Sequence, residues 1–153
     1  NIDRIRALMA RDNLSTAIAQ YESAPFDLQD LGTSYYIIIS DDDPHRSCDE
    51  DIGIYILDRL SYDCHYSVHV AYIKAARGFQ VYAGGMLFVE FMKKLLPHAC
   101  LLGMPPMSKP GALRHAQMIG FELKAVIPSA IEIGKDKNID AKRIDMAITA
   151  LTW

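Results

Sequence analysis

The sequence predicts an α/β fold of the α+β kind, with a mixed, largely antiparallel central sheet flanked by helices. One observation is a succession of strand and helix patterns between residues 66 and 121, which is typical of a βαβ unit. A second is a set of three strand patterns joined by loops between residues 35 and 73, which suits an antiparallel meander. Half of the 153 residues are hydrophobic, so the chain can bury the core of one domain.

The N-terminal residues 1–22 carry apolar side chains at helical spacing, with an interruption after residue 10. This pattern predicts a helix over residues 3–10. A second helix is expected to follow through Tyr21, because Asn13 or Ser15 can cap its first turn with a side-chain oxygen.

Three strands are predicted next. Residues 35–39 read YYIII, and residues 52–57 are also rich in isoleucine; aromatic and β-branched side chains favour strands. The acidic segment 41–51 between them is expected to be a solvated loop, although its carboxylates could also bind a divalent cation. Residues 66–73 alternate larger apolar with small or polar side chains, which is the period of a third strand.

The second half of the chain begins with a helical pattern after residue 78. Its apolar positions are Val81, Leu87, Phe88, Phe91, Met92, Leu95 and Leu96. The short apolar run 99–102 predicts a buried strand, a second helical pattern follows it, and Ile119, Gly120 and Phe121 open a last strand. Because helices connect these strands, we expect part of the sheet to be parallel.

The C-terminal part, residues 131–153, is predicted to lie outside the domain formed by residues 1–130. It begins with a charged segment, and residues 140–151 read as an amphipathic helix that ends close to Trp153. Its apolar face holds Ile144, Ala147, Ile148 and Leu151. This helix either packs on the domain or docks a partner chain.

Charge and cysteine content restrict the classes of function. The net charge is −3, which gives no general attraction to nucleic acid or to an anionic membrane. The three cysteines have no metal-type spacing, which indicates a reducing compartment without a disulfide framework. No apolar run approaches the roughly 20 residues that span a bilayer, and we assign no metal site.

Residues 69–78 read HVAYIKAARG, and a helix, a strand and the pair Gly120-Phe121 follow. This order resembles the core of the GNAT superfamily of acyl-CoA N-acyltransferases, and within it the short GNAT-like proteins of phages and prophages. The resemblance covers roughly residues 5–130. It implies a GNAT-like sheet, although we expect this chain to depart from the family by lacking the strand that usually precedes the first helices.

The resemblance also implies a site for acetyl-CoA. The family binds the pyrophosphate with backbone N–H groups in the turn between the central strand and the next helix, where small residues are needed. The family pattern is Arg/Gln-x-x-Gly-x-Gly/Ala. Arg77 and Gly78 match the common R-G start, whereas a reading shifted by three residues uses Gln80, Ala83 and Gly85.

Simpler interpretations of the same residues stay open. Arg77 and Gly78 can form an ordinary strand-to-helix turn, with Gln80 and Tyr82 standing where the family has small residues. The pair Gly84-Gly85 can serve close packing of the helix on the sheet, since two glycines inside a helix cost about 1–2 kcal/mol relative to alanine.

Two histidines are the candidate catalytic residues. His69 can accept a proton from the substrate amine, because the acidic residue of the phage-type pattern is replaced by Ser67; alternatively His69 is a structural, hydrogen-bonded residue. The tyrosine that protonates the leaving thiolate in the family is replaced by Ala116. His115 is its neighbour, but it points about 100° around the helix.

Two functions therefore remain. The first, which the altered phosphate loop, base and acid positions favour, is a catalytically degenerate GNAT-fold component of a phage virion or its assembly. It would need no cofactor, act through protein partners or a homo-oligomer, and occur in the host cytoplasm or the virion. The second is an active acetyl-CoA-dependent N-acetyltransferase.

Overall fold

The computed structural model describes residues 2–11, 14, 34–41, 50–60, 64–76, 78–133 and 142–153. Their elements, in chain order, are α1 (Ile2–Ala10), β1 (Ser34–Asp41), β2 (Glu50–Arg59), β3 (His65–Tyr72), α3 (Phe79–Leu95), β4 (Cys100–Gly103), α4 (Pro110–Met118), β5 (Glu122–Ile133) and β6 (Lys142–Thr152). The second predicted helix and most of the acidic loop lie outside these residues.

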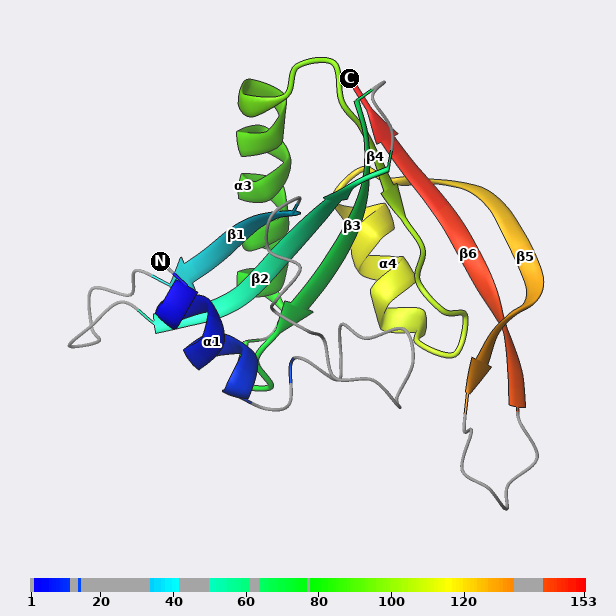
Figure 1. Ribbon diagram of the computed structural model, residues 1–153, viewed down its shortest axis with the longest axis horizontal. Helices are drawn as coiled ribbons and strands as arrows, with labels where there is room; N and C mark the ends of the chain where they lie inside the picture. The colour runs from blue at the N-terminus through cyan, green and yellow to red at the C-terminus, as the bar shows by residue number, and fades with distance from the viewer. Residues whose placement is uncertain are drawn as a thin grey trace.

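The strands form one six-stranded sheet in the order β1-β2-β3-β4-β6-β5. α1 lies on one face of this sheet, and α3 and α4 lie on the other (Figure 1). Only β3 and β4 pair in parallel, and the other neighbours are antiparallel. The predicted α/β fold with a mixed, largely antiparallel sheet flanked by helices is confirmed.

The antiparallel meander of β1, β2 and β3 is also confirmed. Its register places Ser34 opposite Asp58 and Ile56 opposite His69. β2 is the most deeply buried strand, since each of its residues from 52 to 57 is buried. This explains its near-continuous apolar sequence, because a strand covered on both faces has no solvent side.

α3 connects β3 to β4 and covers one face of the sheet. Phe88, Val89 and Met92 of this helix are buried in the core, whereas Leu87, Phe91 and Leu95 are exposed. The predicted strand, helix and strand between residues 66 and 102 are therefore confirmed.

The helix predicted over residues 140–151 is wrong. Residues Lys142–Thr152 form β6, which lies between β4 and β5. The apolar residues 144, 147, 148 and 151 fit a helical face, but the segment is also rich in β-branched side chains, and pairing with two strands favours the extended form. Trp153 then donates its indole N–H to the Leu96 carbonyl at 3.2 Å, so the C-terminal segment is part of the sheet.

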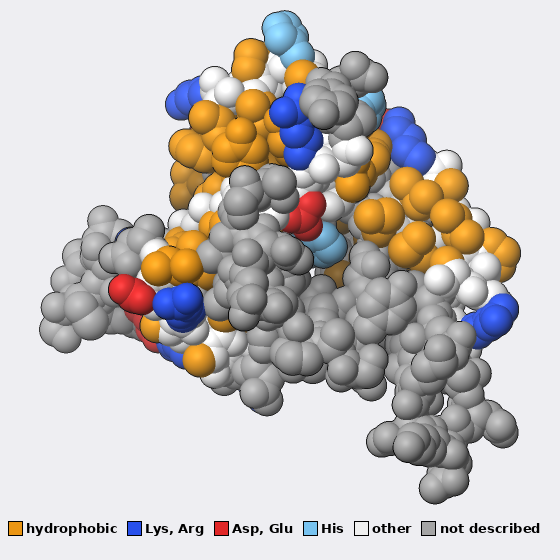
Figure 2. Space-filling model, viewed as in Figure 1, with side chains coloured by type: hydrophobic (Ala, Val, Ile, Leu, Met, Phe, Trp, Pro, Cys, Tyr) orange, Lys and Arg blue, Asp and Glu red, His pale blue; other side chains and the backbone are white. Residues whose placement is uncertain are grey.

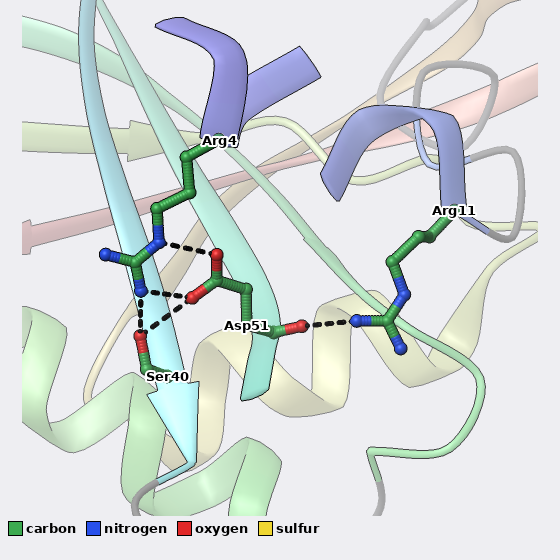
Figure 3. A network of polar contacts seen from close by, with 4 residues as sticks. All are labelled: Arg4, Arg11, Ser40 and Asp51. Carbon is green, nitrogen blue, oxygen red and sulfur yellow. Dashed lines mark hydrogen bonds and ion pairs between the residues drawn. The ribbon is translucent and has the colours of Figure 1, made fainter. Parts of the chain in front are cut away.

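α1 agrees with the first predicted helix and is held on the sheet by both apolar and ionic contacts. Ile5, Leu8 and Met9 are its buried residues. Arg4 donates to both carboxylate oxygens of Asp51 and to Ser40, as Figure 3 shows.

Arg11 continues this network at the end of the helix. It donates to the Asp51 backbone carbonyl at 3.1 Å (Figure 3) and to the Glu50 carboxylate at 2.6 Å. The two arginines therefore hold α1 against the end of β1 and the start of β2.

Within the described part of the chain, no helix combines the length and the hydrophobicity that a membrane span requires. The same residues contain no group of three or more His, Cys, Asp or Glu side chains placed to hold a metal ion.

Candidate functional site

β3 and β4 pair over a short distance and then separate. The parallel register begins at His65 opposite Cys100 and ends at Val68 opposite Gly103. β3 continues to Tyr72, whereas the chain after β4 turns toward β6, where Pro106 bridges to Met146. In Figure 1 the two halves of the sheet diverge beyond this short pairing.

The separation leaves a polar strand edge. The Cys100 N–H donates to the Cys64 carbonyl at 2.9 Å, and the Ile73 N–H donates to the Ile52 carbonyl at 2.9 Å. Because backbone groups alternate along a strand, the even-numbered residues of β3 direct their N–H and C=O toward β4. The Val70 amide therefore faces the open side, and no described residue pairs with it there.

The N-terminus of α3 lies at the end of β3. Gly78 precedes the helix with a φ of 54°, and no side chain caps the first turn, which also contains no acidic residue. The first N–H groups of a helix have no partner inside the helix and attract anions. Apart from the two chain neighbours of Gly78, no described atom lies within 4 Å of the position that its Cβ would take, so a ligand can approach the backbone closely.

The other candidate cofactor residues have different surroundings. Gln80 donates to the Asp41 carboxylate at 2.6 Å, so its side chain reaches β1 rather than β4. Ala83 is half-buried and Tyr82 is exposed, whereas Arg77 lies outside the described residues. The cofactor role of all five predicted positions stays a prediction.

Gly85 has a packing role. A Cβ at this residue would lie 2.5 Å from the Ile119 Cγ2 atom and 2.9 Å from the His115 ring. A Cβ at Gly84 would lie 2.8 Å from the Tyr72 hydroxyl. The two glycines therefore let α3 pack closely on the sheet and on α4, which is the simpler of the two interpretations of this pair.

His69 lies at the first position of β3 beyond the pairing with β4. Its Nε2 atom is 3.2 Å from Oδ2 of Asp58 on β2 and 3.5 Å from the Ser67 hydroxyl. Burial lowers the pKa of His69, and the charge and hydrogen bond of Asp58 oppose this effect. Above its pKa the ring is neutral and can accept a proton.

His115 belongs to a different cluster. Its Nε2 atom is 2.9 Å from the Tyr55 hydroxyl, which is 3.1 Å from the Tyr72 hydroxyl. The Tyr72 hydroxyl donates to the Val81 carbonyl at 3.3 Å. Burial raises the pKa of Tyr72 to about 12 and raises that of Tyr55 as well, so both phenols keep their protons.

Burial also lowers the pKa of His115, so its ring is held neutral among these groups. The sequence patterns predicted no role for the Tyr55 and Tyr72 hydroxyls. Their contacts could have been suspected, because each tyrosine lies inside an apolar strand pattern. A buried tyrosine usually needs a hydrogen-bond partner for its hydroxyl.

The structure does not bring the two candidate histidines together. Tyr55 stacks on Phe88 of α3 with ring centroids 3.9 Å apart, and it lies opposite Val70 in the register. Since side chains alternate between the faces of a strand, His69 lies on the opposite face, where α1 packs. Ala116, which replaces the family's tyrosine, packs against the core.

Comparison with solved structures agrees with this geometry. The chain has the fold found in GNAT-family acetyltransferases. A spermidine N-acetyltransferase chimera from Vibrio cholerae and hSSAT matches with a TM-score of 0.63 at 12% identity, over 99% of this chain and 76% of that one.

Two further structures are similar. An acetyltransferase of the GNAT family from Bacillus anthracis matches with a TM-score of 0.56 at 10% identity, over 67% of this chain and 59% of that one. The ribosomal-protein-S5-alanine acetyltransferase from Vibrio fischeri matches with a TM-score of 0.59 at 12% identity, over 78% and 61%. The chain thus spans about three fifths of the length of these two proteins. No family model and no curated protein matches the sequence.

Proposed function

We propose that this chain is an acetyl-CoA-dependent N-acetyltransferase. The observation that carries the proposal is the separation of β3 from β4 beyond Val68, next to the glycine-led N-terminus of α3. A polar strand edge and an anion-attracting helix terminus follow each other along the chain. The acetyltransferases that share the fold support the same reading.

The residues present fit acetyl-CoA. The open space at Gly78 and the absence of a carboxylate from the first turn of α3 suit a pyrophosphate. Gln80 and Tyr82 do not argue against this fit, because the Gln80 amide reaches Asp41 and the Tyr82 side chain is 37% exposed. When bound, acetyl-CoA supplies an acetyl group activated as a thioester.

His69 is the proton acceptor in this proposal. An alkyl ammonium must lose a proton before its nitrogen can attack a carbonyl carbon. The His69 ring lies at the start of the open edge of β3 and is half-buried, so it is neutral at physiological pH and reachable. We propose a structural role for His115, because its Nε2 atom is already bonded to Tyr55.

Calorimetric titration with acetyl-CoA tests the phosphate site, using Gly78→Asp and Gly78→Asn as a matched pair. Both substitutions strain the backbone alike, because Gly78 has a φ of 54° and a ψ of −111°, and the two side chains have nearly the same shape. Only aspartate adds a negative charge, so it should weaken binding about tenfold or more relative to asparagine. Absence of saturable binding to the parent protein would overturn the proposal.

A non-catalytic role through protein contacts is the second candidate. Apolar side chains gather over α3 and over the β5 and β6 end of the molecule (Figure 2). The exposed residues include Leu87, Phe91 and Leu95 on α3 and Leu123, Val126 and Ile127 on the outer strand β5. Exposed apolar groups of this kind mark interaction surfaces.

A virion or assembly component in the host cytoplasm or virion would be one form of this second role, but none of the similar structures reported above has a name that mentions a phage. Light scattering separates the two candidates. A stable assembly together with no binding of acetyl-CoA favours the second.

A further inference from the structure

Asp58 has a polar partner at each of its carboxylate oxygens. Its Oδ2 atom lies 3.2 Å from His69 Nε2, and its Oδ1 atom accepts a hydrogen bond from the Ser34 hydroxyl. Ser34 is the residue opposite Asp58 in the β1–β2 register. The sheet itself therefore fixes the orientation of this carboxylate.

This contact favours a proton on the Nε2 atom of His69. An ionised carboxylate only accepts hydrogen bonds, so it stabilises a hydrogen on the nitrogen that faces it, and the Ser67 hydroxyl, 3.5 Å from the same nitrogen, can accept that hydrogen as well. In the neutral ring Nε2 is then the donor, and the lone pair is left on Nδ1. No described residue bonds to His69 Nδ1.

The charged groups of the neighbouring helix have other partners. Arg4 on α1 pairs with Asp51, and Arg11, which directly follows α1, pairs with Glu50. Among the described residues, Asp58 is the charged side chain in contact with His69. The side chains of His69 and Asp58 are 23% and 36% exposed, so a substrate can reach the pair from solvent.

We propose that Asp58 is the positioning residue of His69, which holds the ring through Nε2–H so that Nδ1 can accept a proton from the substrate ammonium. This inference rests on the proposed function. In the step, the ammonium N–H bond breaks, an Nδ1–H bond forms, and the amine keeps the electron pair. The imidazolium lies against the negative Asp58 and later returns its proton to water.

Nitrogen-15 NMR of the imidazole rings tests the contact without any need for activity. In the parent protein, above the pKa of His69, Nε2 should appear as the protonated nitrogen. Asp58→Asn should reduce this preference and move the titration of His69 to lower pH, because the opposing negative charge is lost. His69→Gln assigns the signal, and Asp145→Asn, at the β5–β6 hairpin, is the control for loss of one distant charge.

The kinetic test uses the same variants with acetyl-CoA and a panel of primary amines. Asp58→Asn should lower kcat/KM about tenfold or more and shift the acid limb of its pH profile to lower pH, while Asp58→Glu should recover part of the loss. A proton on the Nδ1 atom of His69 in the parent protein would overturn the role of Asp58. An unchanged tautomer in Asp58→Asn would overturn it as well. Failure of the parent to bind acetyl-CoA would instead overturn the proposed function.

Discussion

The Tyr55 hydroxyl and the His115 imidazole share a hydrogen bond of 2.9 Å, although the two residues are 60 positions apart in the chain. It joins the middle of the sheet to α4. The Tyr55 ring lies parallel to Phe88 of α3 at the same time, with an angle of 7° between the planes. One tyrosine thus contacts both helices on this face of the sheet.

Tyr55→Phe should destabilise the fold. The substitution keeps the ring that stacks on Phe88 but removes the hydroxyl that bonds to Tyr72 and His115. Leaving buried polar groups without that partner costs about 1–3 kcal/mol. The free energy of unfolding from urea denaturation measures the effect.

Tyr35→Phe is the matched control, because Tyr35 is 47% exposed and surface changes usually stay within about 0.5 kcal/mol. Equal stability of the two variants would contradict an energetic role for the hydroxyl of Tyr55.

The neutral state of His115 predicts that stability falls in mild acid. Burial places its pKa in the folded state below the ordinary value of 6.5, so the unfolded chain binds the proton first as the pH falls. The contribution is fully present above 6.5 and is lost as the pH drops toward the folded-state pKa. His69 acts in the same direction.

Urea denaturation between pH 8 and about pH 5 measures this dependence. His115→Gln cannot be protonated, so its unfolding free energy should change less over this range than that of the parent. His98→Gln, at an exposed turn, should keep the parent's slope. An identical slope in His115→Gln would show that the titration of this ring is not coupled to unfolding.

Local patterns were sufficient to predict most of the fold. The β-branched runs gave β1 and β2, and the helical spacing after Gly78 gave α3. β6 was missed because its apolar residues fit both a helix and a strand, and its pairing with β4 and β5 decides the outcome. A strand chosen by its neighbours cannot be recognised from its own residues alone.

The candidate site was predictable only in part. The positions of Gly78 at a helix start and His69 on a strand follow from sequence. The contacts of His69 with Asp58 and of His115 with Tyr55 depend on the register of β2 against β3 and on the placement of α4. A one-residue change of register would move a side chain to the other face of the sheet, and the sequence does not specify it.

The ion pair of Arg4 and Asp51 should contribute modestly to the free energy of unfolding. This contribution should be lost at strongly acidic pH. The hydrogen bond from Arg4 is the main cause that lowers the pKa of Asp51 from 3.8. Its contribution is therefore present above that value and is lost as the pH falls through the folded-state pKa. Since Arg4 is 48% exposed, Arg4→Met should cost about 1 kcal/mol or less at pH 7.

The unfolding free energies of the parent and of Arg4→Met should therefore approach each other as the pH falls below 3.8. Arg6→Met is the control, because Arg6 is 59% exposed and lies 3.7 Å from Asp3 within the same helix. A larger loss in the Arg6 variant than in the Arg4 variant would contradict the role of the α1 network.

Only Gly85→Ala should destabilise the protein, although both Gly85→Ala and Gly111→Ala place alanine in a helix. Alanine favours a helix over glycine by about 1 kcal/mol. At Gly111 nothing lies within 4 Å of the new Cβ, so at this position near the start of α4 the variant should be equally stable or slightly more stable than the parent.

At Gly85 the new Cβ would lie 2.5 Å from Ile119 and 2.9 Å from His115. These side chains must move, and overpacking of this kind costs about 1–3 kcal/mol. Denaturation midpoints measured side by side decide the matter: a stabilised Gly85→Ala would mean that α3 does not need the glycine to approach α4 and the sheet.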